Sequence, residues 1–312
     1  MKILLIKTSS LGDLVHAMPA VNDAVDLGFE IDWVVEEAFS EIAELHEGVS
    51  KVIPIAWRRW RKSLISSRDE MRSFKSELRR NCYDVCLDSQ GLLKSGAFSL
   101  LSRCNIRAGY DYGSAREPVV SFFYNKRISV PKNLHAIDRQ RQLFSRALDY
   151  RLQGEPDAGI EKTRQSKKRQ IFLLHGTTWK SKRWPLDCWI GLASKAKSEG
   201  IDVVLSWGSE LERLDAEIIA SRSGITLLPK MGLKQLSAKL SESQAVVGVD
   251  TGLMHLSAAM GIPTLGLYGP TRTDLTGCRG RHVKTLQSRA MDGITFESVW
   301  SGVKELRRLP RS

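Results

Sequence analysis

The chain has few cysteines, and none are paired at a recognisable spacing. Five occur in 312 residues, at Cys82, Cys86, Cys104, Cys188 and Cys278. No pair has metal-ligand spacing with a second pair, and the odd number excludes a complete disulfide framework. We therefore expect neither a zinc module nor a disulfide-stapled secreted domain. A reducing cytoplasm suits this composition.

Long hydrophobic runs are also missing. The apolar run from Ile3 to Ile6 is interrupted at Lys7, so the N-terminus does not offer the apolar core of a signal peptide. Residues 251–271 contain no Asp, Glu, Lys or Arg, but Gly and Pro recur throughout them. This density of helix-breaking residues predicts a buried helix, a turn and a strand rather than a membrane-spanning helix.

Acidic residues are outnumbered. Asp and Glu total 35 against 47 Lys and Arg, which gives a formal net charge of +12. Such a charge predicts an anionic partner: nucleic acid, an anionic membrane face or a phosphorylated substrate. No RNP motif, zinc spacing or helix-turn-helix supports nucleic-acid binding, which stays the weaker alternative. Neither half of the chain opens with Gly-x-Gly-x-x-Gly, so a dinucleotide dehydrogenase is disfavoured.

What the chain does contain is a repeated alternation of strands and helices. The predicted strands are residues 2–6, 31–35, 51–55, 83–87, 171–174, 203–206, 225–228, 245–249 and 264–267, and the predicted helices are 15–25, 74–80, 189–198, 211–221, 233–240 and 296–306. This order predicts an α/β protein of two doubly wound, Rossmann-like domains facing a cleft.

The polar stretch in mid-chain and the final helix set the expected boundaries. We expect an N-terminal domain at 1–155, a linker at 156–170 and a C-terminal domain at 171–290. The last helix, within 291–312, is expected to pack back on the N-terminal domain.

The most informative segment follows the apolar strand 245–249. Asp250-Thr251-Gly252 forms a turn, after which a helix pattern begins. A helix start presents free N–H groups and a favourable dipole to an anion. Thr251 can cap this helix and also bond a phosphate oxygen, and His255 lies one turn further on. An ordinary capped helix start is an equally good interpretation of this segment taken alone.

Seven ordered motifs carry a resemblance to a known family. They are Lys7 to Asp13, Trp33 to Glu37, Arg58 to Lys62, Asp88 to Gly91, Ala115 to Pro118, Thr177-Thr178 with Lys182 and Trp184-Pro185, and Asp250 to Gly252 with His255. In these motifs, from Met1 to about residue 285, the chain resembles the bacterial lipopolysaccharide heptosyltransferases of the GT-B type, glycosyltransferase family 9. The heptosyltransferase I group is the nearest. The resemblance implies transfer of heptose from ADP-heptose to the Kdo sugar of a lipid A precursor, with inversion at the anomeric carbon.

The resemblance also implies the roles of two charged residues. Asp13 would be the general base that accepts the proton of the acceptor hydroxyl. Its residue type and position alone favour a helix cap instead. Lys182 would stabilise the charge that develops on the ADP leaving group, although a surface lysine is the simpler interpretation.

Further donor contacts are implied for Gly12, Thr177, Thr178, Glu212, Met231, Asp250, Thr251, Gly252 and His255. Among them Glu212 would bind the ribose, with Glu210 as an adjacent rival, and Met231 would line the adenine pocket or belong to the core. Asp250 would bond the heptose hydroxyls. Trp179 and Lys180 depart from the family pattern.

Acceptor contacts are expected from Ser10, Arg58, Arg59, Arg61, Lys62, Gln90, Lys94, Arg116, His135 and Arg139. Arginine suits the carboxylates and phosphates of Kdo-lipid A because its guanidinium binds such anions with two parallel hydrogen bonds. Trp57 and Trp60 lie among these cations. They either rest at a lipid–water boundary or pack against the domain.

No Asp lies two residues from another Asp, so the metal-binding Asp-x-Asp pair of the other common glycosyltransferase architecture is missing. We expect no metal and no other cofactor. The expected partners are ADP-heptose and Kdo-lipid A, with no nucleic acid. We expect a monomer in the cytoplasm, peripheral on the inner membrane. Another sugar-nucleotide enzyme of the same architecture, an epimerase or a heptosyltransferase II-like enzyme, is the alternative.

Overall fold

The computed structural model describes residues 1–161 and 168–309. It divides into two compact units, which we call unit 1 (1–161) and unit 2 (162–312). The division falls inside the expected linker 156–170, of which 162–167 lie outside the described residues, as do 310–312.

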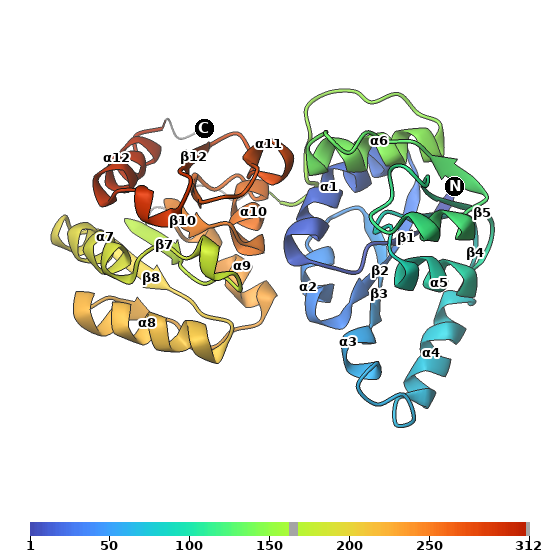
Figure 1. Cartoon of the computed structure of the whole chain (residues 1–312), viewed down its shortest axis with the longest axis horizontal. Helices are drawn as coiled ribbons and strands as arrows, with labels where there is room; N and C mark the ends of the chain where they lie inside the picture. Colours follow the sequence, from blue (N-terminus) through green and yellow to red (C-terminus); the bar gives the residue numbers. More distant parts are fainter. Residues whose placement is uncertain (162–167, 310–312) are drawn as a thin grey trace. The chain divides into compact units, whose positions relative to one another are not determined.

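Unit 1 contains a parallel six-stranded sheet in the order β3-β2-β1-β4-β5-β6 (Figure 1). The strands are β1 (Lys2–Ile6), β2 (Glu30–Glu36), β3 (Val49–Ile55), β4 (Cys82–Asp88), β5 (Arg103–Tyr110) and β6 (Lys126–Ile128). The central strand β1 is buried along Ile3–Ile6 because helices cover both faces of the sheet, which explains its continuous apolar run. Its Leu5 lies opposite Trp33 of β2 and Leu87 of β4.

The helices of unit 1 connect these strands. They are α1 (Leu11–Asp26), α2 (Ser40–Ala43), α3 (Trp57–Trp60), α4 (Arg68–Leu78), α5 (Leu93–Leu101) and α6 (Ala136–Leu148), with 3₁₀ turns η1 (Glu37–Phe39) and η2 (Pro118–Phe123). Helices α1 and α6 pack side by side. A buried ion pair joins them, because the Arg141 guanidinium donates to both carboxylate oxygens of Asp23 at 2.6 and 3.0 Å.

Unit 2 repeats this topology. Its sheet has the order β12-β11-β10-β7-β8-β9 and is also parallel. The strands are β7 (Gln170–Leu174), β8 (Asp202–Leu205), β9 (Thr226–Leu227), β10 (Ala245–Val249), β11 (Thr264–Tyr268) and β12 (Val283–Gln287). Counted within each unit, both sheets follow the Rossmann order 3-2-1-4-5-6. The prediction of two doubly wound, Rossmann-like units is therefore confirmed.

The helices of unit 2 are α7 (Leu186–Ser198), α8 (Glu210–Ser223), α9 (Leu233–Ser241), α10 (Gly252–Ala259), α11 (Thr273–Thr276) and α12 (Phe296–Leu306), with 3₁₀ turns η3 (Lys180–Lys182) and η4 (Met291–Gly293). The segment 251–271 forms α10, a turn and β11, as its Gly and Pro content predicted. None of the helices in the described part of the chain combines the length and the hydropathy needed to cross a bilayer.

The expected docking of the last helix on the N-terminal domain is wrong. Helix α12 packs on α7 and on β10, β11 and β12 of unit 2. Its Val299, Trp300 and Val303 are buried in the core of that unit. Gly302 allows the close approach, because a Cβ there would lie 2.9 Å from Leu265 of β11. The helix thus covers a sheet face that would otherwise be exposed.

Several elements were not predicted from the sequence. They are the strands β5, β6 and β12, the helices α5 and α6, and the one-turn helices α2, α3 and α11. The first five residues of β5, Arg103 to Arg107, are exposed or only partly buried and include two arginines, so the strand lacks the apolar run by which the central strands were recognised.

Candidate functional site

In a sheet of this order, ligands bind at the carboxyl ends of the strands where the strand order reverses. That point lies between β1 and β4 in unit 1, and between β7 and β10 in unit 2. The predicted site residues Ser10, Asp13 and Gln90 follow β1 and β4. Likewise Thr177, Lys182 and Asp250 follow β7 and β10.

In unit 1 the loop after β1 ends in a capped helix. Ser10 is the N-cap of α1, and the Asp13 carboxylate accepts hydrogen bonds from the Ser10 amide at 2.8 Å and from its hydroxyl at 3.1 Å. Asp13 is therefore the third residue of a capping box rather than the N-cap itself. The N-cap interpretation of this aspartate is therefore wrong in position, although Asp13 does help to cap α1, and its role as a base remains a prediction.

Gln90 braces the same loop from β4. Its side-chain oxygen accepts hydrogen bonds from the amides of Thr8 at 3.0 Å and Ser9 at 3.2 Å. The turn at Gln90 is held by the buried Asp88 carboxylate, which accepts from the amides of Gln90 and Gly91. Gly91 has φ +69°, a conformation that favours glycine. Burial raises the pKa of Asp88 despite these bonds.

Sequence reasoning missed Lys7, which lies at the end of β1 and is almost fully buried. Its ammonium donates to the Ser89 carbonyl at 3.3 Å. Burial lowers the pKa of Lys7, the carboxylates of Asp13 and Asp88 oppose that shift, and Arg139 and Arg116 add to it. These charges therefore share one neighbourhood around the β1 loop. The sequence did contain a signal for this residue, because Lys7 directly follows the apolar run of β1.

Two predicted acceptor residues at the start of α6 have structural roles. Arg139 donates to the Ser114 carbonyl at 2.8 Å, and its guanidinium lies 5.0 Å from the centre of the Tyr110 ring. His135 is buried and caps α6 by accepting from the Ile137 amide at 3.2 Å. Their contacts with an acceptor stay predictions, and burial makes His135 the less accessible of the two.

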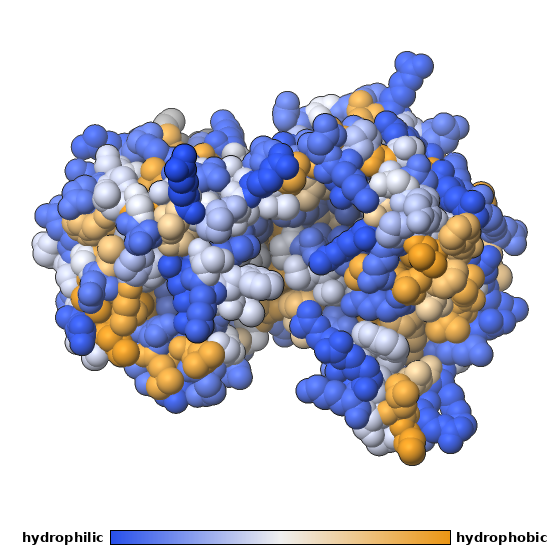
Figure 2. Space-filling view, viewed as in Figure 1, coloured by the Kyte–Doolittle hydropathy of each residue, from blue (hydrophilic) through white to orange (hydrophobic). Residues whose placement is uncertain are grey.

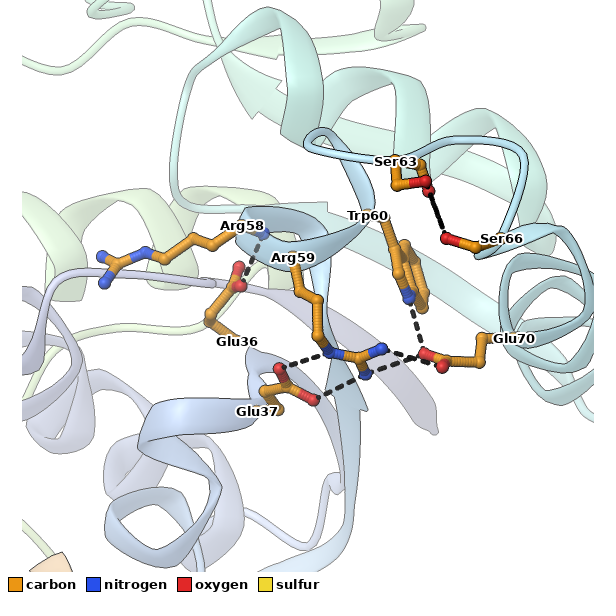
Figure 3. A network of polar contacts seen from close by, with 8 residues as sticks. All are labelled: Glu36, Glu37, Arg58, Arg59, Trp60, Ser63, Ser66 and Glu70. Carbon is orange, nitrogen blue, oxygen red and sulfur yellow. Dashed lines mark hydrogen bonds and ion pairs between the residues drawn. The ribbon is translucent and has the colours of Figure 1, made fainter.

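The basic segment around α3 contains two kinds of cation (Figure 3). Arg59 is held by Glu37 at 3.2 Å and by Glu70 at 2.7 Å. Hydrogen bonds from Arg59, and then from Trp60, lower the pKa of Glu70 to about 2. Arg58 differs, because only its backbone amide bonds to Glu36, at 2.8 Å, and its guanidinium points away from this network.

Arg61 and Lys62 complete the segment and are exposed. Lys94 of α5 lies close enough to interact with Glu36 and with the like charges of Arg58 and Arg61, and burial lowers its pKa. The cations available to an anion in this part of unit 1 are therefore Arg58, Arg61, Lys62 and Lys94. Arg59 is already neutralised by two glutamates.

The two tryptophans of this segment pack against unit 1. Trp60 is buried and its indole donates to Glu70 at 2.8 Å. Trp57 packs edge-to-face on Phe98 of α5, with ring centres 5.6 Å apart. The lipid–water boundary is therefore the wrong interpretation for Trp60, and packing is the right one.

In unit 2 three strand-end loops converge on Asp250. Lys182 of η3 lies 2.5 Å from its carboxylate, the Thr271 hydroxyl donates at 2.9 Å, and His255 of α10 lies 3.6 Å away. Burial alone would raise the pKa of Asp250. The hydrogen bonds from these groups and the charge of Lys182 hold it well below its usual value. Thr271 was not among the predicted site residues, although its Gly269-Pro270-Thr271 turn was visible in the sequence.

Thr251 is the N-cap of α10, and Gly252 opens the helix. The Thr251 side chain makes no capping hydrogen bond with the described residues. Free N–H groups at a helix start are suited to binding an anion, and here they adjoin Asp250 and Lys182. Trp184, by contrast, is buried and donates to the Ile294 carbonyl at 2.8 Å, so it anchors its loop.

Glu212 lies at the start of α8. Its carboxylate accepts from the amides of Gly208 at 2.8 Å and Ser209 at 3.1 Å, which completes a capping box. The backbone at Gly176 lies against this carboxylate, since a Cβ there would be 2.5 Å from Glu212. Glu210 is exposed and paired with Arg213 at 2.8 Å. Glu212 is thus the glutamate beside the β7 loop that carries Thr177 and Thr178.

A cavity of about 520 Å³ opens beside that loop in unit 2. Its lining includes His175, Lys180, Arg183, Asp215 and Arg289. It is lined by none of the predicted donor residues. The candidate donor site is therefore not this cavity but the group formed by Asp250 with Lys182, Thr271 and His255. Within the described residues no group of three or more His, Cys, Asp or Glu side chains is arranged to hold a metal ion.

Comparison with known proteins adds three findings. The sequence profile of glycosyltransferase family 9 (heptosyltransferase) matches residues 71–299. Lipopolysaccharide heptosyltransferase 1 of Pseudomonas aeruginosa is 43% identical over 291 residues, which cover 90% of this chain and 82% of that protein. The solved structure of E. coli heptosyltransferase WaaC with ADP has a TM-score of 0.91 and 36% identity, covering 98% of this chain and 100% of that one.

The E. coli enzyme has also been solved with ADP-2-deoxy-2-fluoro heptose. That structure has a TM-score of 0.87 and 35% identity, covering 98% of this chain and 99% of the other. The likeness therefore extends over both units, and its fold is that of the GT-B heptosyltransferases.

Proposed function

The chain belongs to glycosyltransferase family 9, and we propose that it transfers heptose from ADP-L-glycero-D-manno-heptose to Kdo of Kdo-lipid A. Membership makes it a heptosyltransferase of lipopolysaccharide synthesis. The donor and acceptor are our proposal. One observation supports it: the Lys182–Asp250 ion pair lies beside the start of α10, whose N–H groups can bind an anion. It does so in a chain that is 36% identical to a heptosyltransferase solved with ADP.

The donor binds to unit 2 in this proposal. The diphosphate accepts hydrogen bonds from the first turn of α10 and from the hydroxyls of Thr177 and Thr178. Lys182, held in place by Asp250, supplies the positive charge that a leaving diphosphate needs. Asp250 also accepts hydrogen bonds from heptose hydroxyls, while Glu212 binds the ribose and Met231 lines the adenine pocket.

The acceptor binds to unit 1, and Asp13 acts as the general base. The acceptor hydroxyl gives its proton to the Asp13 carboxylate as its oxygen attacks the anomeric carbon of heptose. The bond from that carbon to the diphosphate oxygen breaks on the opposite face, so the configuration inverts and ADP leaves. Lys7, Arg116 and Arg139 surround this loop and suit the acceptor's carboxylates.

Incubation with ADP-heptose and Kdo-lipid A tests the proposal, with ADP release and product mass as readouts. We expect ADP only when the acceptor is present, together with a product heavier by one heptose. An epimerase would instead convert the sugar nucleotide without a lipid acceptor. We also propose that no metal takes part, so turnover should survive EDTA, and loss of turnover with EDTA would refute this point.

A further inference from the structure

Four large apolar side chains are exposed on and beside α5 of unit 1. Leu93 and Leu100 lie on the exposed side of α5, and Val119 and Phe122 lie on the adjoining turn η2. The opposite side of α5 is buried through Gly96. Phe122 is 65% exposed. Figure 2 shows an apolar patch on the surface of unit 1 around α5. A patch of this kind marks an interaction surface.

A second apolar group forms the tip of the loop between α3 and α4. Ile65 is 84% exposed, and the neighbouring Leu64 is exposed as well. The base of the loop is anchored at the buried Trp60, and the Ser66 hydroxyl donates a hydrogen bond to the Ser63 hydroxyl at 2.7 Å (Figure 3). Figure 2 shows this tip on the same face of unit 1 as the α5 patch.

Cations flank both apolar groups. Arg61, Lys62 and Arg68 are exposed beside the tip. Lys94 follows Leu93 on α5, and the Arg127 guanidinium lies 5.6 Å from the centre of the Phe122 ring. Apolar side chains interleaved with Lys and Arg are typical of surfaces that bind anionic bilayers, because the cations attract lipid phosphates while the apolar groups insert.

Unit 2 offers a useful contrast. Helix α8 also exposes Leu211, Leu214 and Ile218. These three residues are interleaved with Glu210, Asp215 and Glu217, and the helix Glu210–Ser223 has four acidic and two basic residues. An anionic bilayer would repel α8, whereas it would attract the face around α5.

We propose that Leu64, Ile65, Leu93, Leu100, Val119 and Phe122 form a docking face that inserts into the interfacial region of an anionic bilayer. The proposal rests on the proposed function, because a lipid-anchored acceptor must be reached at a membrane surface. A bilayer suits this face better than a second copy of the chain. A two-fold interface would place this positively charged face against its own copy, and the like charges would repel each other.

Vesicle sedimentation tests the docking face. The full chain is mixed with phosphatidylcholine vesicles that either contain or lack phosphatidylglycerol. We expect binding only to the anionic vesicles, weakened by added NaCl. The double variants Leu93→Gln with Phe122→Gln, and Leu64→Ser with Ile65→Ser, should each bind about tenfold more weakly. The matched control, Leu211→Gln with Leu214→Gln on α8, should bind like the wild type.

Other results would overturn the docking face. They are absence of binding to anionic vesicles by the wild type, unchanged binding by both double variants, or an equal loss in the α8 control. A change from dimer to monomer in the Leu93 and Phe122 variant would show that a second copy covers this face instead.

Turnover separates this inference from the proposed function. The docking variants should turn over vesicle-embedded Kdo-lipid A more slowly, and a deacylated Kdo saccharide at the wild-type rate. If the wild type releases no ADP with either acceptor, the proposed function fails while vesicle binding can still be observed. If all variants use both acceptors equally well, the docking face fails and the function stands.

Discussion

The two units share one strand order, yet their strand ends present different chemistry. In unit 1 the first turn of α1, which follows β1, holds Asp13 near the cations Lys7, Arg116 and Arg139. In unit 2 the loops pair one lysine with one aspartate, Lys182 with Asp250, beside a free helix start. The same topology therefore creates two unlike sites, because the strand ends fix where a side chain lies and the residue types fix what it does.

This difference suits the two halves of a transfer reaction. A diphosphate leaving group needs positive charge and N–H donors, which unit 2 provides. In the proposed reaction the acceptor hydroxyl needs a carboxylate base and an anionic acceptor needs surrounding cations, and we propose that Asp13 and the cations near it in unit 1 fill these roles. This interpretation would be wrong if Asp250 were the base and Asp13 bound the donor.

The largest effect is expected for Asp13→Asn. We expect transfer to be abolished, because an amide cannot accept the proton, while ADP affinity stays within a few-fold. The Asn oxygen can still accept from the Ser10 amide, so the cap of α1 should survive. Steady-state turnover and ADP titration measure the two quantities. An unchanged rate would remove Asp13 from the mechanism.

The next effect is expected for Lys182→Ala. Loss of one charge stabiliser should lower kcat by about 10²–10³. The matched variant Lys180→Ala, in the same 3₁₀ turn, should have a much smaller effect because the Lys182–Asp250 pair remains intact. Single-turnover rates with both variants measure the difference. A rise in acceptor KM alone would contradict the role of Lys182 at the leaving group.

A smaller effect is expected among the cations proposed to bind the acceptor. Arg61→Gln should raise the KM for the acceptor about tenfold, the size of a lost charge-assisted hydrogen bond, and leave the KM for ADP-heptose unchanged. Arg59→Gln should leave the acceptor KM nearly unchanged, because Glu37 and Glu70 already neutralise Arg59. Equal increases in both variants would show that Arg59 leaves its glutamates to bind the acceptor.

The smallest effect concerns stability rather than turnover. Burial lowers the pKa of His46 in unit 1 to about 4 from 6.5. Between these values the unfolded chain binds more protons than the folded one, so acidification destabilises the fold. From about pH 7 to about pH 5 the loss due to His46 should be about 2 kcal/mol. Urea unfolding of wild type and His46→Gln measures it, and an equal loss in the variant would exclude His46.

Much of the fold could be predicted from the sequence. The apolar runs of β1, β7, β10 and β11 were recognised because strands buried on both faces leave no polar alternation. The α12 helix was placed at 296–306, where the structure has it. Its partner was misassigned, because an amphipathic helix shows which side is apolar but not which sheet it covers.

For the candidate sites too, the sequence determined one part and the tertiary structure another. The sequence alone determined which residues end the central strands, and therefore that Asp13, Gln90, Lys182 and Asp250 lie in the segments that follow those strands. Only the tertiary structure decided their partners. Lys182 meets Asp250 from 68 positions away, and Arg59 is neutralised by glutamates 11 and 22 positions away. Such contacts depend on strand order and helix packing, because local patterns fix an element and a face but not which distant charge lies opposite.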